Sequence, residues 1–553
     1  MTARDRRQPP LLLLGLDGAT FSVIEPLTQA GQLPNLARWM QEGTARPLLS
    51  TTPPMSFPAW SSLQTGLAPG EHGLFDFTQK IAGAYRLRFT NAADRRGTSL
   101  FARVSRAGGR VLALGMPATF PPEAVNGLLV PGFDSPLSAG SRSDFASDPA
   151  LYRRIAAKIG PWMSPDLNES ARGDEWRERA VATLLARIER KTAFALEALS
   201  QLVQRDGTAP DLISIVFSES DTIAHHYWRD FDSHSPRRDP AASAERRGAV
   251  AAVYRALDVA CGALRAAVGA NAACVVVSDH GAGGASRRVL HVNRYLEQLG
   301  FLARRRAIAQ LPERWIRRLR ERVLAHLPPV ATQALFRRAR GAAARLESCA
   351  RFSGFDWSRS FAFSEEANTQ PGVWINLRGR EAEGSVAPDD YERVRGEVID
   401  ALRDWKLPGG APIIAWARRR EEVYAGPCVE CAPDVVCELA LEDGYAHSLV
   451  PTPWRASTSP AIHTLCEEEF AGGRGRGMNG THRPEGVWIA ADTETAKLPP
   501  PRDLTEVAPL LLTRCGISWQ ADDGAAKNRD ARPYTAEEAA RVRERLRALG
   551  YLE

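Results

Sequence analysis

The sequence is poor in the features that mark secreted, membrane-spanning or zinc-ribbon proteins. Its 553 residues contain only eight cysteines, and these are scattered along the chain. Cys428 and Cys431 form one C-x-x-C pair, with no second pair to complete a four-thiolate zinc site. No apolar run approaches the length of a membrane span, and Leu11–Leu14 is too short for the apolar core of a signal peptide. We therefore expect a soluble cytoplasmic protein.

Several sequence motifs of common enzyme classes are also missing. The chain has neither G-x-S-x-G, the strand-turn-helix motif of α/β-hydrolases, nor G-x-x-x-x-G-K-[ST], the phosphate loop of P-loop enzymes. Gly475, Gly477 and Gly480 match G-x-G-x-x-G, but no predicted strand precedes them and no helix follows. This match is therefore rejected as a dinucleotide site. The chain also lacks internal repeats and low-complexity regions.

The charge of the chain is unevenly distributed. The formal net charge is +6, and residues 303–346 contain twelve Arg against two Glu, a local balance of +10. The rest of the chain is therefore slightly acidic, at about −4 by subtraction. The Arg-rich stretch fits either a solvated helical cap or a surface that attracts anionic substrate or anionic lipid.

Three apolar runs predict buried parallel strands, and each is followed by an aspartate. Leu11–Leu16 precedes Asp17, Asp211–Phe217 precedes Asp221, and Cys274–Val277 precedes Asp279. Ligands gather at the carboxyl ends of such strands, although an Asp before Gly is also a common turn residue. Three carboxylates at one sheet edge repel one another unless a cation neutralises them. The pattern therefore predicts a metal site.

Histidines accompany two of these aspartates. His225 follows Asp221 by four residues, so both side chains lie on one face if the chain is helical there. His280 directly follows Asp279, and carboxylate with imidazole suits a borderline metal such as zinc. His482 lies in a glycine-rich loop and carries no signal by itself.

Ser56 stands at the start of another predicted helix. Pro58 falls in its first turn and Gly66 near its end, and we predict Ser56 as the N-cap. A helix N-terminus favours a phosphate-like anion and the ionised form of a serine, although an ordinary N-cap fits the same pattern. His72 lies in the glycine-rich segment Gly70–Gly73, where we favour a turn over a ligand.

Together these motifs resemble the alkaline phosphatase superfamily, and within it the type I phosphodiesterase and nucleotide pyrophosphatase branch. Five motifs in the family's order carry the resemblance, which covers nearly the whole length. They are Leu16-Asp17-Gly18, the Ser56 helix with Thr65-Gly66 and Gly70-x-His72-Gly73, Asp221-x-x-x-His225, Asp279-His280-Gly281, and Gly480-Thr481-His482-Arg483-Pro484-Glu485-Gly486.

The resemblance implies an α/β fold, a three-layer αβα sandwich around a mostly parallel central sheet. We expect the catalytic core in residues 1–300 and 426–553. Residues 301–350 would form the Arg-rich helical insertion, and residues 351–425 a small α/β subdomain.

The resemblance also implies two divalent metal ions, usually zinc, with manganese as the alternative. Asp17, Ser56, Asp279 and His280 match the set that holds one ion and the nucleophile. The set around the other ion is matched by Asp221, His225 and His482. Ser56 would attack phosphorus and form a phospho-seryl intermediate.

Two positions depart from the patterns of related branches. The diesterase branch often has Thr as nucleophile and Asn further along the helix, where this chain has Ser56 and Ala59. The sulfatase branch needs Arg four residues after the nucleophile, and this chain has Trp60 there. Sulfate esters are thereby disfavoured, and a nucleotide preference is left open.

We therefore expect a metal-dependent hydrolase of phosphodiesters. A phosphomonoesterase or phosphotransferase of the same fold is the alternative, and a non-catalytic protein that binds anionic surfaces is the alternative of a different class. The expected partner is a small anionic phosphate ester. No specific nucleic acid is expected, and peripheral membrane contact and the oligomeric state are left open.

Overall fold

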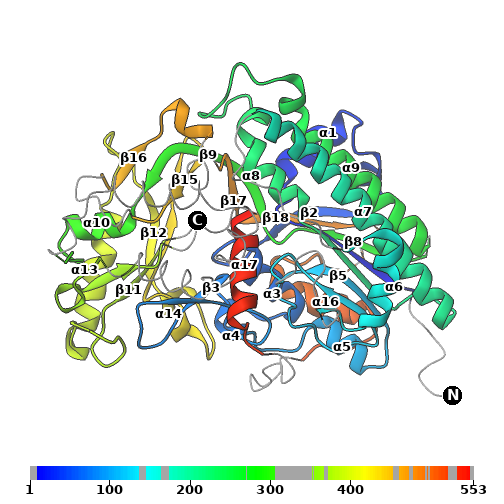
Figure 1. The fold of residues 1–553 in the computed structure, drawn as a ribbon, viewed down its shortest axis with the longest axis horizontal. Helices are drawn as coiled ribbons and strands as arrows, with labels where there is room; N and C mark the ends of the chain where they lie inside the picture. Colours follow the sequence, from blue (N-terminus) through cyan, green and yellow to red (C-terminus); the bar gives the residue numbers. More distant parts are fainter. Residues whose placement is uncertain are drawn as a thin grey trace, which may run out of the picture.

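The computed structural model describes residues 9–135, 145–162, 174–269, 271–305, 352, 354–366, 371–452, 460–471, 478–491, 495, 498–520 and 532–548. The chain forms two lobes side by side, a larger one around a seven-stranded sheet and a smaller one around a four-stranded sheet (Figure 1).

The central sheet of the larger lobe is mostly parallel, as the sequence predicts. Its strand order is β2-β18-β8-β1-β7-β5-β6. Strands β8, β1, β7, β5 and β6 run parallel, and β18 is antiparallel to both of its neighbours. The strands are β1 (Leu11–Leu16), β2 (Thr44–Leu49), β5 (Val111–Met116), β6 (Gly127–Pro131), β7 (Leu212–Phe217), β8 (Ala273–Val277) and β18 (Glu485–Ala490).

Helices cover both faces of this sheet, which makes the predicted three-layer αβα sandwich (Figure 1). Alternate residues of β1 serve the two cores: Leu12 and Leu14 pack in one, and Leu11 and Leu13 in the other. The first core receives α1 (Phe21–Gln29), α2 (Pro34–Glu42), α6 (Pro149–Ile159), α7 (Asp174–Asp206), α8 (Glu219–Phe231), α9 (Ala244–Val268) and the C-terminal α17 (Ala536–Ala548). The second receives α3 (Ser56–Thr65), α5 (Leu100–Arg106) and α16 (Val507–Arg514).

The smaller lobe contains an antiparallel sheet in the order β10-β11-β13-β12. Helix α13 (Tyr391–Arg403) contributes to its core. The sheet extends beyond the range 351–425 predicted for the subdomain, because β13 pairs with β11 and β12 and not with the central sheet. An apolar run alone does not identify its pairing partner. The strands are β10 (Ala362–Ser364), β11 (Gly372–Ile375), β12 (Ile414–Arg419) and β13 (Val435–Leu439).

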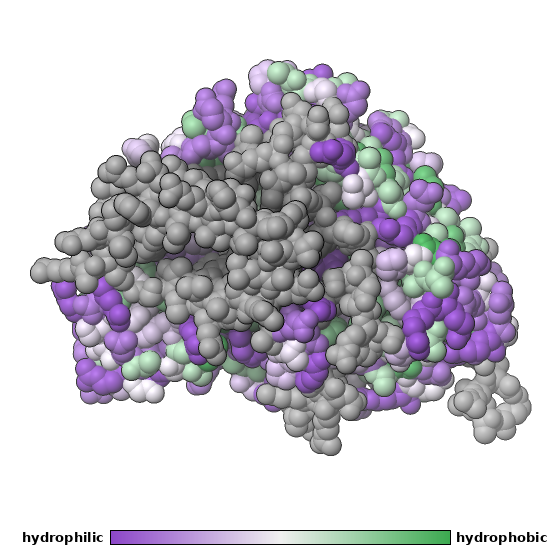
Figure 2. All heavy atoms as spheres, in the orientation of Figure 1, coloured by the Kyte–Doolittle hydropathy of each residue, from purple (hydrophilic) through white to green (hydrophobic). Residues whose placement is uncertain are grey.

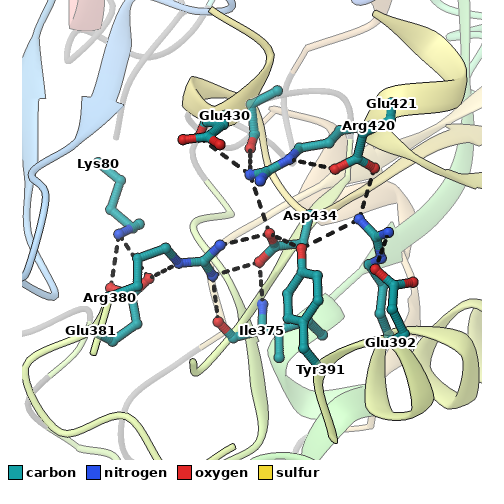
Figure 3. Close-up of polar contacts among 12 residues, drawn as sticks. Lys80, Ile375, Arg380, Glu381, Tyr391, Glu392, Arg420, Glu421, Glu430 and Asp434 are labelled. Atoms are coloured by element: carbon teal, nitrogen blue, oxygen red, sulfur yellow. Dashed lines mark hydrogen bonds and ion pairs between the residues drawn. The ribbon is translucent and has the colours of Figure 1, made fainter. Parts of the chain in front are cut away.

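A buried carboxylate, Asp434, organises the polar contacts of this lobe (Figure 3). It accepts hydrogen bonds from both terminal nitrogens of Arg380 at 2.7 and 2.6 Å, from Tyr391 Oη at 2.7 Å and from the Ile375 backbone N–H at 2.7 Å. Arg420 Nη1 lies 3.2 Å away. The carboxylate is thus fully neutralised by protein groups.

Strand β9 (Gly281–Leu290) joins the two lobes. It begins directly after His280, pairs first with β17 (Gly480–Arg483), and then pairs with β15 (Tyr445–Leu449) and β16 (Ile462–Thr464). Strand β14 (Leu441–Glu442) extends this sheet at its edge. A hairpin of β3 (Thr78–Lys80) and β4 (Leu87–Phe89) makes a second link, because Lys80 Nζ bonds both oxygens of Glu381 at 3.0 and 2.8 Å.

Some sequence predictions fall outside the described residues. Most of the Arg-rich insertion, from residue 306 onward, and the glycines at 475 and 477 belong to this group. In the described part of the chain, no helix is long and apolar enough to cross a membrane. The described residues on the face shown in Figure 2 are mainly hydrophilic around the rim of both lobes, with apolar residues in small patches.

Candidate active site

The three predicted strand ends meet at one edge of the central sheet. Asp17 follows β1, Asp279 and His280 follow β8, and Asp221 lies in the first turn of α8, just after β7. The side chains form two adjacent groups: Asp17, Asp279 and His280 in the first, and Asp221, His225 and His482 in the second. All six residues are buried.

Ser56 belongs to the first group. Its Oγ lies 3.2 Å from Asp17 Oδ1 and 3.2 Å from His280 Nε2. His280 Nε2 also lies 3.3 Å from Asp279 Oδ2. A hydroxyl, two carboxylates and an imidazole therefore converge on one point.

The position of Ser56 in its helix differs from the prediction. Met55, in an extended conformation, is the N-cap of α3, and Ser56 is the first helical residue. Its hydroxyl therefore bonds Asp17 and His280 instead of capping the helix. The predicted end of the helix is confirmed, since Gly66 is the C-cap with a φ of 76°. Ser56 thus lies at the electropositive end of a ten-residue helix.

The second group is built on one face of α8 and on β17. His225 Nε2 lies 3.2 Å from Asp221 Oδ1, as their spacing of four residues predicts. His482, from β17, places its Nε2 3.6 Å from the same oxygen and 3.1 Å from His225 Nε2. The two groups adjoin, because the rings of His280 and His482 stack with centroids 3.8 Å apart.

Backbone carbonyls fix the tautomer of all three histidines. His225 Nδ1 lies 2.8 Å from Gly480 O, and His482 Nδ1 lies 2.8 Å from Pro54 O. His280 Nδ1 lies 3.0 Å from Gly281 O. A carbonyl oxygen only accepts, so each Nδ1 carries the proton and each Nε2 presents a lone pair to the site. Such outer contacts are characteristic of metal-ligating histidines.

The electrostatics of the first group favour the binding of a cation. Burial, together with the neighbouring carboxylates, raises the pKa of Asp17 and Asp279 well above the usual range. Burial and His280 lower the pKa of His482 well below its usual value, so this ring is neutral. Facing imidazole lone pairs and clustered carboxylates suit divalent ions such as zinc or manganese.

Several supporting contacts were missed by the sequence reasoning. Trp60 Nε1 donates to Asp17 Oδ2 at 3.0 Å, and Ser220 Oγ donates to Asp17 O at 2.6 Å. Gly18 donates its N–H to Asp279 Oδ1 at 3.2 Å, and a Cβ there would lie 2.9 Å from Asp221 Oδ1. Its φ of 65° and this close approach explain why glycine follows Asp17. In the sequence, the Asp17-Gly18 pair was the one indication of these contacts.

His72 lies outside the site, as its glycine-rich surroundings suggested. It ends the short helix α4 (Pro69–His72), with Nε2 3.0 Å from Ser62 Oγ and Nδ1 accepting from the Leu74 N–H at 3.1 Å. Burial lowers its pKa to about 3, so the ring is neutral and structural.

The sequence and the fold were compared with those of known proteins. The model of the family "Type I phosphodiesterase / nucleotide pyrophosphatase" matches residues 11–447. The fold is similar to that of phosphonoacetate hydrolase from Sinorhizobium meliloti 1021, solved with phosphonoacetate, at 15% identity and a TM-score of 0.52, covering 92% of this chain and 96% of that one. Human ectonucleotide pyrophosphatase/phosphodiesterase 5 has 12% identity and a TM-score of 0.47, with coverage of 93% and 96%. No curated protein matches the chain.

The family match spans β1 to β15 and therefore includes every site residue except His482. The chain belongs to the type I phosphodiesterase and nucleotide pyrophosphatase family of the alkaline phosphatase superfamily.

Proposed function

We propose that the protein hydrolyses phosphodiesters through a phospho-seryl intermediate on Ser56, with two zinc ions held by the two groups of side chains. Family membership makes it an enzyme that acts on phosphoric ester bonds. The observation that carries the finer proposal is the environment of Ser56. Its buried hydroxyl lies 3.2 Å from both Asp17 Oδ1 and His280 Nε2, at the N-terminus of α3.

Each group has a distinct task. When bound, the ions supply positive charge that lowers the pKa of the serine hydroxyl and stabilises phosphoryl oxygens. Asp17 and His280 orient Ser56 Oγ, and the N-terminal end of α3 favours its ionised form. Asp221, His225 and His482 form the neighbouring wall, where the rest of the phosphoryl group would lie.

The reaction proceeds in two displacements. Ser56 Oγ forms a bond to phosphorus, and the bond from phosphorus to the first alcohol breaks. The alcohol leaves with the bonding electrons and takes up a proton. Water then attacks the phospho-seryl group, which restores Ser56 and releases a phosphate monoester. Burial of the site keeps bulk water away during the first displacement.

Kinetics with Ser56→Ala test the proposal. We expect kcat for bis(4-nitrophenyl) phosphate to fall by about a thousandfold or more, while bound metal, measured by elemental analysis, is retained. Ser56→Thr keeps the attacking oxygen and should keep part of the activity. Ser61→Ala is the matched control, because Ser61 lies on the same helix and its hydroxyl donates to Phe57 O at 2.7 Å.

Two results would contradict parts of the proposal. Near-normal turnover by Ser56→Ala would exclude the covalent route. Faster turnover of 4-nitrophenyl phosphate than of the diester would make the protein a phosphomonoesterase. Rapid quenching of the reaction with bis(4-nitrophenyl) phosphate, followed by mass spectrometry, should find one 4-nitrophenylphosphoryl group on the peptide that contains Ser56.

A further inference from the structure

A cavity of about 540 Å³ lies at the C-terminal end of α8, where Trp228 and Asp232 line it. Its walls are formed by chain segments that directly follow the site residues. Thr20 stands three residues after Asp17, and Arg483 stands next to His482. The volume falls in the range of pockets that bind small molecules.

Helix α8 links the cavity to the second group. Asp221, His225, Trp228 and Asp232 are spaced four, three and four residues apart, so they follow one face of the helix to its C-cap. The first two face the site, and the last two line the cavity. At 1.5 Å per residue, Trp228 lies about 5 Å and Asp232 about 10 Å beyond His225 along the helix axis.

The walls offer hydrogen-bond donors and acceptors together. Trp228 is 6% exposed, and its indole N–H has no hydrogen-bond partner in the part of the chain that the structure describes. Asp232 accepts from Tyr445 Oη at 2.9 Å and presents its carboxylate nearby. Thr20 and Ser22 add two hydroxyls at the start of α1.

Glycines hold these walls in place. A Cβ on Gly284 would lie 2.7 Å from the Tyr445 ring and 3.0 Å from Trp228, and a Cβ on Gly283 would lie 2.5 Å from Arg483 Nε. Arg483 Nη2 instead bonds Gly284 O at 2.9 Å, which fixes the guanidinium against β9. The aromatic rings and the guanidinium are thereby pre-arranged.

The direction of the proposed displacement also points to this cavity. In phosphoryl transfer the attacking and leaving oxygens lie roughly in line, so the alcohol departs on the side of phosphorus opposite Ser56. Ser56 bonds the first group, and the second group adjoins that group through the stacked rings of His280 and His482. The far side of phosphorus is therefore the side of α8 and its cavity.

We propose that this cavity binds the leaving alcohol of the substrate, and that this alcohol is a polyol or sugar. The inference rests on the proposed hydrolysis. Hydroxyl groups both donate and accept, so they can bond the indole N–H of Trp228 and the carboxylate of Asp232 at the same time. The rings of Trp228 and Tyr445 supply apolar contact for the carbon skeleton. The cavity is also lined by two further carboxylates, Asp443 and Glu485, which can accept hydrogen bonds from additional hydroxyl groups.

The test compares two diesters, glycerophosphoinositol and bis(4-nitrophenyl) phosphate. Trp228→Phe removes the N–H and keeps a ring, and Asp232→Asn removes the charge and keeps the shape. We expect each variant to lower the ratio of kcat/KM for the inositol ester to that for the aryl ester about tenfold, the effect of one hydrogen bond. Trp416→Phe, in the smaller lobe, is the matched control and should leave this ratio unchanged.

An unchanged ratio in both cavity variants would overturn the assignment of the cavity. Faster hydrolysis of glycerophosphocholine than of glycerophosphoinositol would overturn the polyol assignment. Calorimetric titration with myo-inositol separates the cavity from the chemistry. If neither ester is hydrolysed, the proposed function fails, but inositol binding that Trp228→Phe weakens about tenfold still supports the cavity. Absence of inositol binding in that case would overturn it.

Discussion

Asp17 and Asp434 are both completely buried aspartates, yet their surroundings are opposite in charge. Asp434 is surrounded by Arg380, Arg420 and Tyr391, and their hydrogen bonds outweigh burial and hold its pKa below the usual range (Figure 3). Asp17 has carboxylates as neighbours, and burial with their repulsion raises its pKa. A carboxylate that the protein neutralises itself is structural, whereas a cluster that it leaves negative is built for a cation.

The largest expected effect is a loss of stability when the polar contacts around Asp434 are removed. Asp434→Ala removes the buried carboxylate that Arg380 and Arg420 share, and each arginine then keeps an Nε contact with one neighbouring glutamate, Glu381 or Glu421. We expect the free energy of unfolding to fall by about 3–5 kcal/mol. Urea denaturation measures the change. Asp400→Ala is the control, because Asp400 is 78% exposed and its nearest Arg403 nitrogen is 3.9 Å away, so little should change. A loss below about 1 kcal/mol for Asp434→Ala would show that the network contributes little.

The next effect concerns the contact between Trp60 and Asp17. Trp60→Phe keeps an aromatic ring in the core but removes the N–H that holds Asp17 Oδ2. We expect zinc affinity to fall about 10- to 100-fold, as for other partners of metal ligands. Competition with a chelator measures it, and rescue of kcat at saturating zinc would show that Trp60 positions Asp17. Unchanged zinc affinity would make Trp60 a packing residue only.

The smallest expected effect is a gain of stability. The raised pKa values of Asp17 and Asp279 mean that the folded metal-free chain binds protons more tightly than the unfolded chain. Its stability should therefore fall as the pH rises above about 4. Asp17→Asn removes one of the charges, so in the presence of chelator it should raise the free energy of unfolding at pH 8 by on the order of 1 kcal/mol.

The pH dependence provides the control for this last experiment. Below about pH 3, where the Asp17 carboxyl group is protonated in both the folded and the unfolded chain, the difference between Asp17→Asn and the wild type should shrink. With zinc present the order should reverse, because the variant loses a ligand for the ion. A metal-free variant less stable than the wild type at pH 8 would contradict the charge argument.

The sequence predicted the central sheet and the three strand-end aspartates, Asp17, Asp221 and Asp279, because their signal is local. An apolar run followed by Asp predicts both a strand and the position of its carboxyl end. The four-residue spacing of Asp221 and His225 predicts that both side chains lie on the same face of a helix. The carbonyl partners of His225 and His482 could not be predicted, because Gly480 and Pro54 lie 255 and 428 residues away from them in the sequence.

Two further differences have the same origin. Ser56 was expected to cap its helix, but its hydroxyl bonds Asp17 and His280, which lie 39 and 224 residues away in the sequence. Residues 426–553 were expected in the catalytic core, but β13, which lies in this range, pairs within the smaller lobe. The hydrogen bonds of Ser56 and the pairing of β13 both depend on residues that are distant in the sequence, and the local sequence does not identify those residues.

The position of β9 has a consequence for any attempt to dissect the protein. The strand starts beside His280 and then depends on β15 and β16 for its outer pairing. A shortened chain without these partners would present an open strand edge next to the active site, and such edges recruit strands from other molecules. The smaller lobe therefore protects the larger one from self-association, and trimming it should yield aggregates rather than a minimal enzyme.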